Sequence, residues 1–112
     1  MKEAAAKGMV QGSLDLLVLS ALADGPKYGY LVQKHLQAAV TIQAGTLYPL
    51  LHRLELEKLI HARWDSSTSR QRKWYELTPA GRRRLTERAE DWVRVTDCIR
   101  ELLAPVLNPK SA

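Results

Sequence analysis

The side chains that support enzymatic chemistry are scattered along this sequence without a catalytic pattern. Enzymes of most classes need a nucleophile beside a base, a paired acid and base, or a glycine-rich loop that holds phosphate. The serines gather around residues 66–69, and neither a G-x-G-x-x-G nor a Walker sequence occurs. His35, His52 and His61 fall on different predicted elements without metal-ligand spacing, and Cys98 is the only cysteine. We therefore expect no enzymatic activity, no metal and no cofactor.

A polar face on one predicted helix suits a different chemistry, the recognition of a polyanion. The helix spans about residues 46–58, and its apolar stripe follows the i, i+3, i+4, i+7 pattern with Leu47, Leu50, Leu51 and Leu54. The opposite face carries Thr46, Tyr48, Pro49, His52 and Arg53. A helix of this kind can dock on a core and enter the major groove of DNA. We predict that these five residues contact DNA; for Arg53, an ion pair with Glu57 is the alternative.

Two predicted strands, residues 60–64 and 73–77, follow this helix and are joined by a polar, basic turn. The turn and the start of the second strand carry Arg70, Arg72 and Lys73. Cations at an exposed hairpin tip can contact backbone phosphates or the minor groove, although a purely solubilising tip would look the same. Trp64 and Trp74 alternate with polar neighbours, which predicts that both pack the hairpin.

Two further helices are needed to position the polar helix. The first begins at Ser13, a good N-cap, and ends at residues 24–26, where Asp-Gly-Pro stops it. The second covers about residues 28–38, and residues 41–43 form a β-branched stretch that would suit a minor edge strand. Three helices followed by a hairpin are the layout of a winged helix-turn-helix. The predicted fold is therefore mainly α with a small β-hairpin, and residues 9–78 form the DNA-binding domain.

A long last helix completes the predicted fold. Thr78 and Pro79 are a good N-cap and first helical residue, and the next breaker is Pro105. We expect a helix over residues 79–104 and a frayed tail over 105–112. Its apolar residues step by 4 and 3, which is heptad spacing: Leu85, Ala89, Trp92, Val95, Thr96, Ile99, Leu102 and Leu103. This stripe predicts a homodimer, and association would help a domain this small to bury enough surface.

Overall charge and length agree with this interpretation. The chain has 112 residues, with 17 Lys and Arg against 12 Asp and Glu, for a net charge of +5. This favours double-stranded DNA over other partners. One cysteine and no apolar run of membrane-spanning length predict a cytoplasmic protein without a membrane partner. Residues 1–8 read either as a native N-terminal arm or as an added helical spacer of the EAAAK type.

Four segments of the sequence, in order, resemble the PadR family (phenolic-acid decarboxylase regulators). They are residues 12–19 (GSLDLLVL), 29–30 (GY), 45–55 (GTLYPLLHRLE) and 72–81 (RKWYELTPAG). The resemblance runs from about Val10 to Leu103 and implies a dimeric repressor of a palindromic operator, with Tyr48 as the reading-helix tyrosine at the DNA. Some relatives bind planar aromatic compounds between subunits, and Trp92 is the residue that would take that part here; a core role for Trp92 is the alternative.

Two positions depart from the family pattern. Gln43 stands where relatives usually have a capping serine, which predicts a loss of about 1 kcal/mol of local capping. Lys58 stands near the helix end where relatives tend to have glycine, which predicts a mildly strained left-handed residue.

A different function remains compatible with the same fold. A winged helix can also serve as a protein-interaction module without specific DNA binding. Such a module needs an apolar face on its third helix, and the polar side chains at residues 46, 48, 52 and 53 argue for DNA instead.

Overall fold

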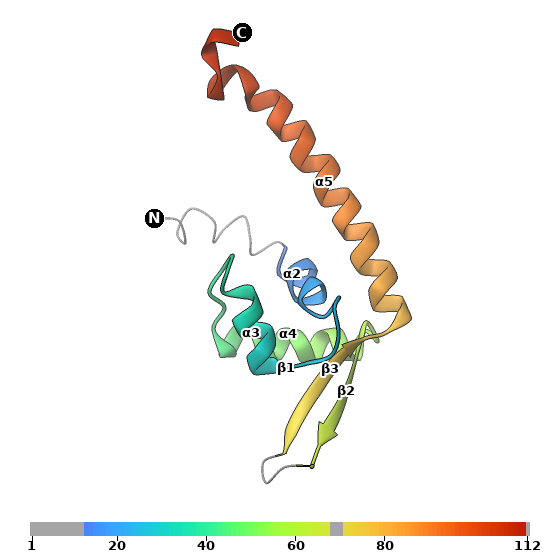
Figure 1. Ribbon diagram of the computed structural model, residues 1–112. Coiled ribbons are helices and arrows are strands. Elements are labelled where there is room, and N and C mark those ends of the chain that lie inside the picture. The colour runs from blue at the N-terminus through green and yellow to red at the C-terminus, as the bar shows by residue number, and fades with distance from the viewer. Residues whose placement is uncertain (1–12, 68–70, 112) are drawn as a thin grey trace.

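A computed structural model describes residues 13–67 and 71–111 of the chain. The element order is α2 (Leu14–Ala21), β1 (Lys27–Tyr28), α3 (Gly29–Leu36), α4 (Ala44–Leu56), β2 (Ile60–Asp65), β3 (Arg72–Leu77), α5 (Pro79–Leu107) and a short 3-10 turn, η1 (Pro109–Ser111) (Figure 1). The three strands form an antiparallel sheet in the order β1-β3-β2. The predicted winged helix with a long C-terminal helix is confirmed.

The core lies where α2, α3 and α4 meet the base of the sheet. The four leucines of the predicted stripe on α4 are all buried, as are Val18 and Leu19 of α2, the C-cap residue Leu22 that follows α2, and Val32 and Leu36 of α3. Leu59, Ile60, Tyr75 and Leu77 close the core from the sheet side. Burying a leucine contributes about 1.5–3 kcal/mol, so this cluster fixes which face of α4 points outward.

Several predicted bounds were wrong by a few residues. The helix α3 ends at Leu36, and residues 41–43 form no strand; Ile42 is instead buried in the core. The small edge strand is β1, where Lys27 pairs with Tyr75 and Tyr28 with Trp74. The helix α4 begins at Ala44, and its N-cap Gln43 makes no capping hydrogen bond to the described residues. Lys58 has a φ of 62°, so the prediction of a left-handed residue at this position is confirmed.

The helix α5 is longer than predicted. Thr78 caps it by accepting a hydrogen bond from the backbone N–H of Gly81, and the helix continues through Pro105 to Leu107. The prediction that Pro105 ends the helix is wrong, so residues 105–112 are not simply a tail. Pro105 removes one N–H donor, and its ring crowds the carbonyl of Glu101 four residues earlier. Glu101 is exposed, so water can hydrogen-bond the carbonyl that Pro105 leaves without a donor.

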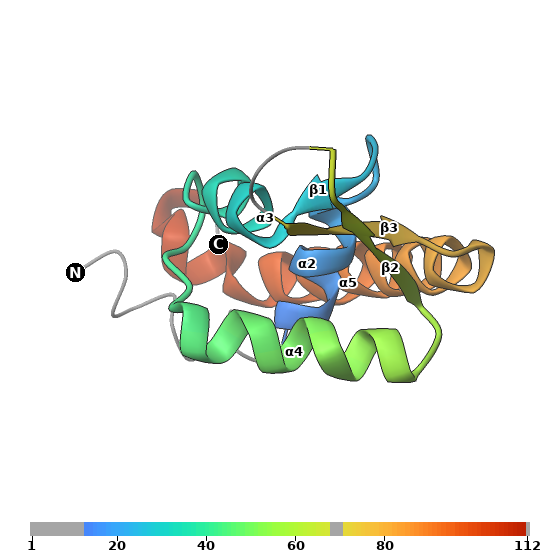
Figure 2. The ribbon, with the colours of Figure 1, turned by 90° about the horizontal axis from the view of Figure 1, so that it is seen from below.

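A tight joint connects the end of α4 to the start of α5. The Thr78 backbone N–H donates to the Leu59 carbonyl oxygen at 3.1 Å, and the Thr78 hydroxyl donates to the Lys58 carbonyl oxygen at 2.7 Å. Gly81 passes so close to the Leu59 carbonyl that a Cβ atom would overlap it. From this joint α5 extends beyond the rest of the domain (Figure 1), and seen from below it runs behind α2 (Figure 2).

Candidate nucleic-acid interface

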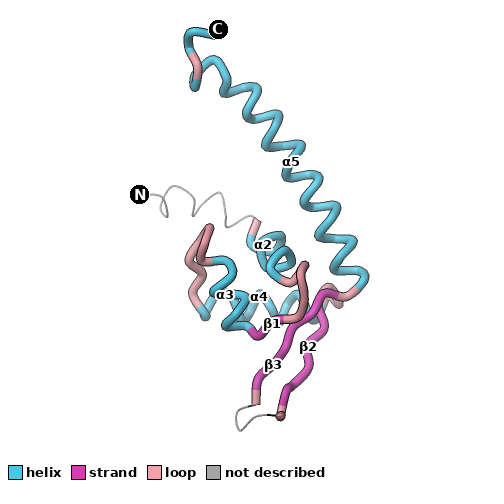
Figure 3. The backbone as a smooth tube through the Cα atoms, viewed as in Figure 1, coloured by secondary structure: helices cyan, strands magenta, loops and turns pink. Residues whose placement is uncertain are grey.

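The helix α4 and the β2–β3 hairpin lie at the end of the domain away from the free end of α5 (Figures 1 and 3). Thr46, Tyr48, Pro49 and His52 are all exposed on α4, opposite the buried leucines. The predicted helix face is therefore free to approach a ligand. Whether these residues contact DNA stays a prediction.

The ring of Tyr48 packs against Gly29, the first residue of the neighbouring helix α3, and this contact forms the seat of Tyr48. Its ring lies over Gly29, and an ideal Cβ on Gly29 would lie 2.6 Å from the ring Cε1 and 2.8 Å from the hydroxyl oxygen. Any side chain at position 29 would therefore require the ring to move. The side chain remains 43% exposed, so the ring is held on one side and open on the other. The Gly29-Tyr30 pair of the sequence thus serves the tyrosine of α4.

Arg53 is held by two carboxylates. Its guanidinium donates to Asp15 on α2 at 2.6 Å and to Glu57 at 3.0 Å, so the ion pair weighed as an alternative is present. The hydrogen bonds that Arg53 donates to Asp15 and Glu57 raise the pKa of Arg53. Arg53 therefore ties α4 to α2, and a phosphate at this position would share it with both acids.

The predicted cations of the hairpin differ in their surroundings. Arg70 lies outside the described residues. Arg72 is exposed, with its guanidinium 5.0 Å from the centre of the Tyr28 ring. Lys73 is half-buried, and its ammonium donates to Glu55 of α4 at 3.2 Å. Of the two described cations, Arg72 is the better placed for phosphate, because Lys73 is already paired.

A hydrogen-bond network that the sequence did not reveal anchors the hairpin to β1. Asp65 accepts hydrogen bonds from the Tyr28 hydroxyl and the Trp74 indole N–H, both at 3.0 Å, and from the backbone N–H and hydroxyl of Ser67. The Ser67 bonds, followed by those from Trp74 and Tyr28, hold the pKa of Asp65 far below its ordinary value. An Asx turn after the strand was the only local signal in the sequence for this residue.

The two hairpin tryptophans have different roles. Trp74 stacks on the Tyr28 ring with centroids 3.8 Å apart, as the packing prediction required. Trp64 is 65% exposed, so the prediction that it packs the hairpin is wrong. Trp64 lies on β2, which is an edge strand of the sheet in the described part of the chain.

Within residues 13–67 and 71–111, no group of three or more His, Cys, Asp or Glu side chains could hold a metal ion. In the same part of the chain, no helix combines the length and hydropathy needed to cross a membrane.

Comparison with known proteins places this geometry in a family. The model of the PadR-like transcriptional regulator family matches residues 18–87, from α2 into the first turns of α5. The chain belongs to the PadR-like family of transcriptional regulators. The family match therefore includes the first turns of α5.

Two solved structures and one further relative by sequence are similar to this PadR-like chain. A PadR family transcriptional regulator from Eggerthella lenta is 39% identical and superposes with a TM-score of 0.81 over 89% of both chains. Bacillus subtilis PadR in complex with operator DNA is 25% identical with a TM-score of 0.61, over 71% of this chain and 46% of that one. The transcriptional regulator Rv3488 of Mycobacterium tuberculosis is 37% identical over 78 residues, 69% of this chain and 73% of that protein.

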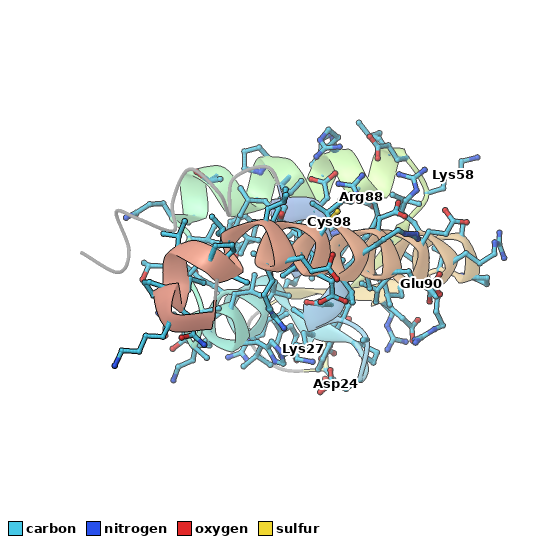
Figure 4. The ribbon with its side chains drawn as sticks, turned by 90° about the horizontal axis from the view of Figure 1, so that it is seen from above. Asp24, Lys27, Lys58, Arg88, Glu90 and Cys98 are labelled. Atoms are coloured by element: carbon cyan, nitrogen blue, oxygen red, sulfur yellow. The ribbon has the colours of Figure 1, made fainter. Side chains whose placement is uncertain are left out.

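The helix α5 of this PadR-like regulator carries the predicted dimer stripe. Leu85 packs against the core of its own domain, and Ala89 and Thr96 are half-buried. The other members, Trp92, Val95, Ile99, Leu102 and Leu103, are between 44% and 76% exposed. Figure 4 views α5 from above, with Arg88, Glu90 and Cys98 labelled along it. An apolar stripe this exposed has no partner among the described residues of its own chain.

Trp92 also borders a small groove between α5 and the start of α2. The groove has a volume of about 410 Å³ and is lined by Ser13, Leu16, Arg88, Asp91, Trp92 and Val95. The indole therefore faces both the predicted dimer surface and a hollow of its own subunit.

Proposed function

We propose that this PadR-like regulator is a homodimeric, sequence-specific repressor of the cytoplasm that binds a palindromic operator. The observation that carries the proposal is the seat of Tyr48, because Gly29 fixes the ring of an exposed aromatic residue on the outer face of α4. A side chain that reads a base edge must be held in place before it binds, and this one is. The Bacillus subtilis relative was solved in complex with operator DNA, which supports DNA binding as the function of this chain.

In the proposed complex α4 enters the major groove. Thr46 and Tyr48 approach the DNA at the N-terminal end of α4, and Pro49, His52 and Arg53 continue along the groove. The hairpin lies over the flanking backbone, where Arg70, Arg72 and Lys73 supply positive charge. The net charge of +5 adds a favourable, salt-dependent attraction to DNA.

The proposed dimer forms through the exposed stripe of α5. Two reading helices related by a twofold axis then reach successive major grooves, about 34–36 Å apart or a multiple of that distance. Trp92 lies in this stripe and beside the groove to α2, so an aromatic effector bound there would touch both subunits and change their angle. Such an effector would release the DNA by favouring the other dimer geometry.

The decisive experiment is a selection of binding sites from random duplex DNA at about 150 mM salt, which is close to physiological ionic strength. The wild-type protein should enrich a palindrome, and Tyr48→Ala should fail to recover it. If both proteins enrich the same palindrome, Tyr48 does not read DNA. If neither enriches any sequence and binding is weak and salt-sensitive, the proposed function is wrong, and a protein partner for the α4 face becomes the better hypothesis.

A salt titration tests the hairpin separately. Arg72→Ala should weaken binding to every sequence alike and reduce the slope of log affinity against log salt by about one unit, since one phosphate contact is lost. Arg94→Ala is the matched control, because Arg94 is an exposed arginine of α5 that, within the described residues, forms an ion pair with Asp91 of the same helix. An equal slope change in both variants would mean that only net charge matters.

The dimer is tested by placing a charge on the stripe. Ile99→Glu should convert the dimer to a monomer in sedimentation equilibrium, because the carboxylate would be buried between two helices. Val93→Glu introduces the same charge on α5 at an exposed position outside the stripe and should leave the dimer intact. Dimerisation of both variants would remove α5 as the interface.

A further inference from the structure

Asp65 and Arg72 stand opposite each other at the open end of the hairpin, yet they form no ion pair. Asp65 is the last residue of β2, Arg72 is the first of β3, and the two are partners in the strand register. Side chains of directly opposite residues have Cβ atoms about 4.5–5.5 Å apart, and opposite charges at such positions attract. Among residues 13–67 and 71–111, however, no acid pairs with Arg72.

The carboxylate of Asp65 is instead occupied by uncharged donors. Its Oδ1 accepts hydrogen bonds from the backbone N–H of Ser67 at 2.9 Å and from the hydroxyl of the same residue at 2.6 Å. Its Oδ2 accepts from the Tyr28 hydroxyl and the Trp74 indole N–H, both at 3.0 Å. A carboxylate has about four acceptor positions, so these four donors use its full capacity. The carboxylate is thus satisfied without a cation.

The guanidinium of Arg72 rests on an aromatic ring instead of an acid. It lies 5.0 Å from the centre of the Tyr28 ring, and the side chain is exposed. A contact with the face of a ring leaves the N–H donors, which lie in the plane of the guanidinium, free to bind an anion. Tyr28 therefore contacts both members of the missing ion pair: its hydroxyl binds Asp65, and its ring supports Arg72.

Removal of the Tyr28 hydroxyl would leave one acceptor position of Asp65 Oδ2 empty. The side chain opposite Asp65 in the register is Arg72, so its guanidinium is the donor best placed to fill that position. A hydrogen bond between two charged groups is stronger than one from a neutral donor. An acid that holds Arg72 in this way would compete with a DNA phosphate for the same N–H groups.

We propose that the Tyr28 hydroxyl, together with the other neutral donors around Asp65, prevents an ion pair between Asp65 and Arg72 and so keeps Arg72 available for a DNA phosphate. Tyr28 is then a positioning residue, which acts on DNA only through Arg72. The consequence for DNA rests on the proposed function; the formation of the ion pair when the hydroxyl is removed does not.

The experiment compares Tyr28→Phe with the double variant Tyr28→Phe/Asp65→Asn in the full chain. Phenylalanine keeps the ring beneath Arg72 and its stack on Trp74, and it removes only the hydroxyl. In a salt series on operator DNA, Tyr28→Phe should bind up to about fivefold more weakly, as expected for competition by an exposed ion pair. Its slope of log affinity against log salt should be smaller by about one unit. The double variant should regain the wild-type slope, because no carboxylate remains to hold Arg72.

The opposite result would mean that the network only holds the hairpin in place. In that case Asp65→Asn alone would weaken DNA binding, and the double variant would bind no better than Tyr28→Phe; either outcome would overturn the proposal. Glu76→Gln is the matched control, because it also removes a carboxylate from the hairpin, at an exposed position of β3 whose register partner is His61. Added to Tyr28→Phe, it should not restore the slope; equal restoration would mean that only net charge matters.

A second measurement observes the ion pair without DNA. The side-chain Nε–H signal of Arg72 in a ¹⁵N-labelled chain is assigned by its loss in Arg72→Ala. It should shift in Tyr28→Phe and return toward the wild-type position in the double variant with Asp65→Asn. An unmoved signal in Tyr28→Phe would overturn the proposal. If the signal moves as expected but the wild type selects no operator, the proposed function fails while the inferred ion pair stands.

Discussion

The seat of Tyr48 allows a sharp test, the substitution Gly29→Ala. The added methyl carbon would lie 2.6 Å from the Tyr48 Cε1, whereas ordinary contact begins at about 3.4 Å. The ring must therefore move by about 0.8 Å, the difference between these two distances. Because Tyr48 is 43% exposed on its other side, it can move outward without displacing the core.

The expected cost to folding is small and the expected cost to DNA binding is large. A displaced rotamer costs about 0.5–1.5 kcal/mol. Alanine in a helix recovers up to about 1 kcal/mol relative to glycine. The free energy of unfolding should therefore change by less than about 1 kcal/mol. Loss of one well-placed base contact costs about 1–3 kcal/mol, so affinity for the selected operator should fall by about 5- to 150-fold.

The assay combines urea unfolding with fluorescence anisotropy on operator DNA. Gly45→Ala, where a Cβ meets nothing within 4 Å, reports the effect of alanine on a helix without a clash. If Gly29→Ala acts through Tyr48, the double variant with Tyr48→Ala should bind no more weakly than Tyr48→Ala alone. Additive losses in the double variant, or unchanged affinity in Gly29→Ala, would refute the seat as the means of positioning Tyr48.

Three further predictions concern stability. Thr78→Ala should lower the free energy of unfolding in urea by about 1 kcal/mol through loss of the N-cap, whereas Thr86→Ala, an exposed threonine further along α5, should have little effect. Lys58→Gly should raise it by about 1 kcal/mol, because glycine adopts φ of 62° without strain; a decrease would mean that the lysine side chain matters more than its backbone. Burial, followed by the hydrogen bond to Asp65, raises the pKa of Tyr28 above 10.0, so the wild type has full stability below that value and loses it as pH rises through the raised pKa. Tyr28→Phe should show a shallower loss as pH rises above 10.0 in the same assay, and parallel curves would contradict the assignment.

The parts of the fold that follow from periodic patterns were predictable from the sequence. The leucine stripe of α4 identified both its buried face and, by elimination, its outer face, and both agree with the structure. The capping role of Thr78 and the left-handed Lys58 were also correct, because caps and turns depend on residue type at one position. The predicted DNA contacts, dimer residues and effector residue are placed by the structure but stay predictions.

The parts that depend on contacts between distant residues could not be predicted. The strand β1 has two residues and exists because it pairs with β3, almost fifty positions later. The ion pair of Arg53 with Glu57, which the sequence offered as an alternative to a DNA contact, is present, yet the bond from Arg53 to Asp15 joins residues 38 apart. Asp65 and Tyr28, which anchor the hairpin, are 37 apart. Local sequence carries no signal for such pairs.

The joint at Leu59, Thr78 and Gly81 makes α5 a rigid lever on α4. The 29 residues of α5 span about 44 Å at 1.5 Å per residue, so a tilt of about 5° at the joint moves its far end by about 4 Å. In a dimer held through α5, that angle sets the separation of the two reading helices. Changes confined to the few residues of the joint would then alter the spacing between half-sites that the protein measures, without touching any residue at the DNA.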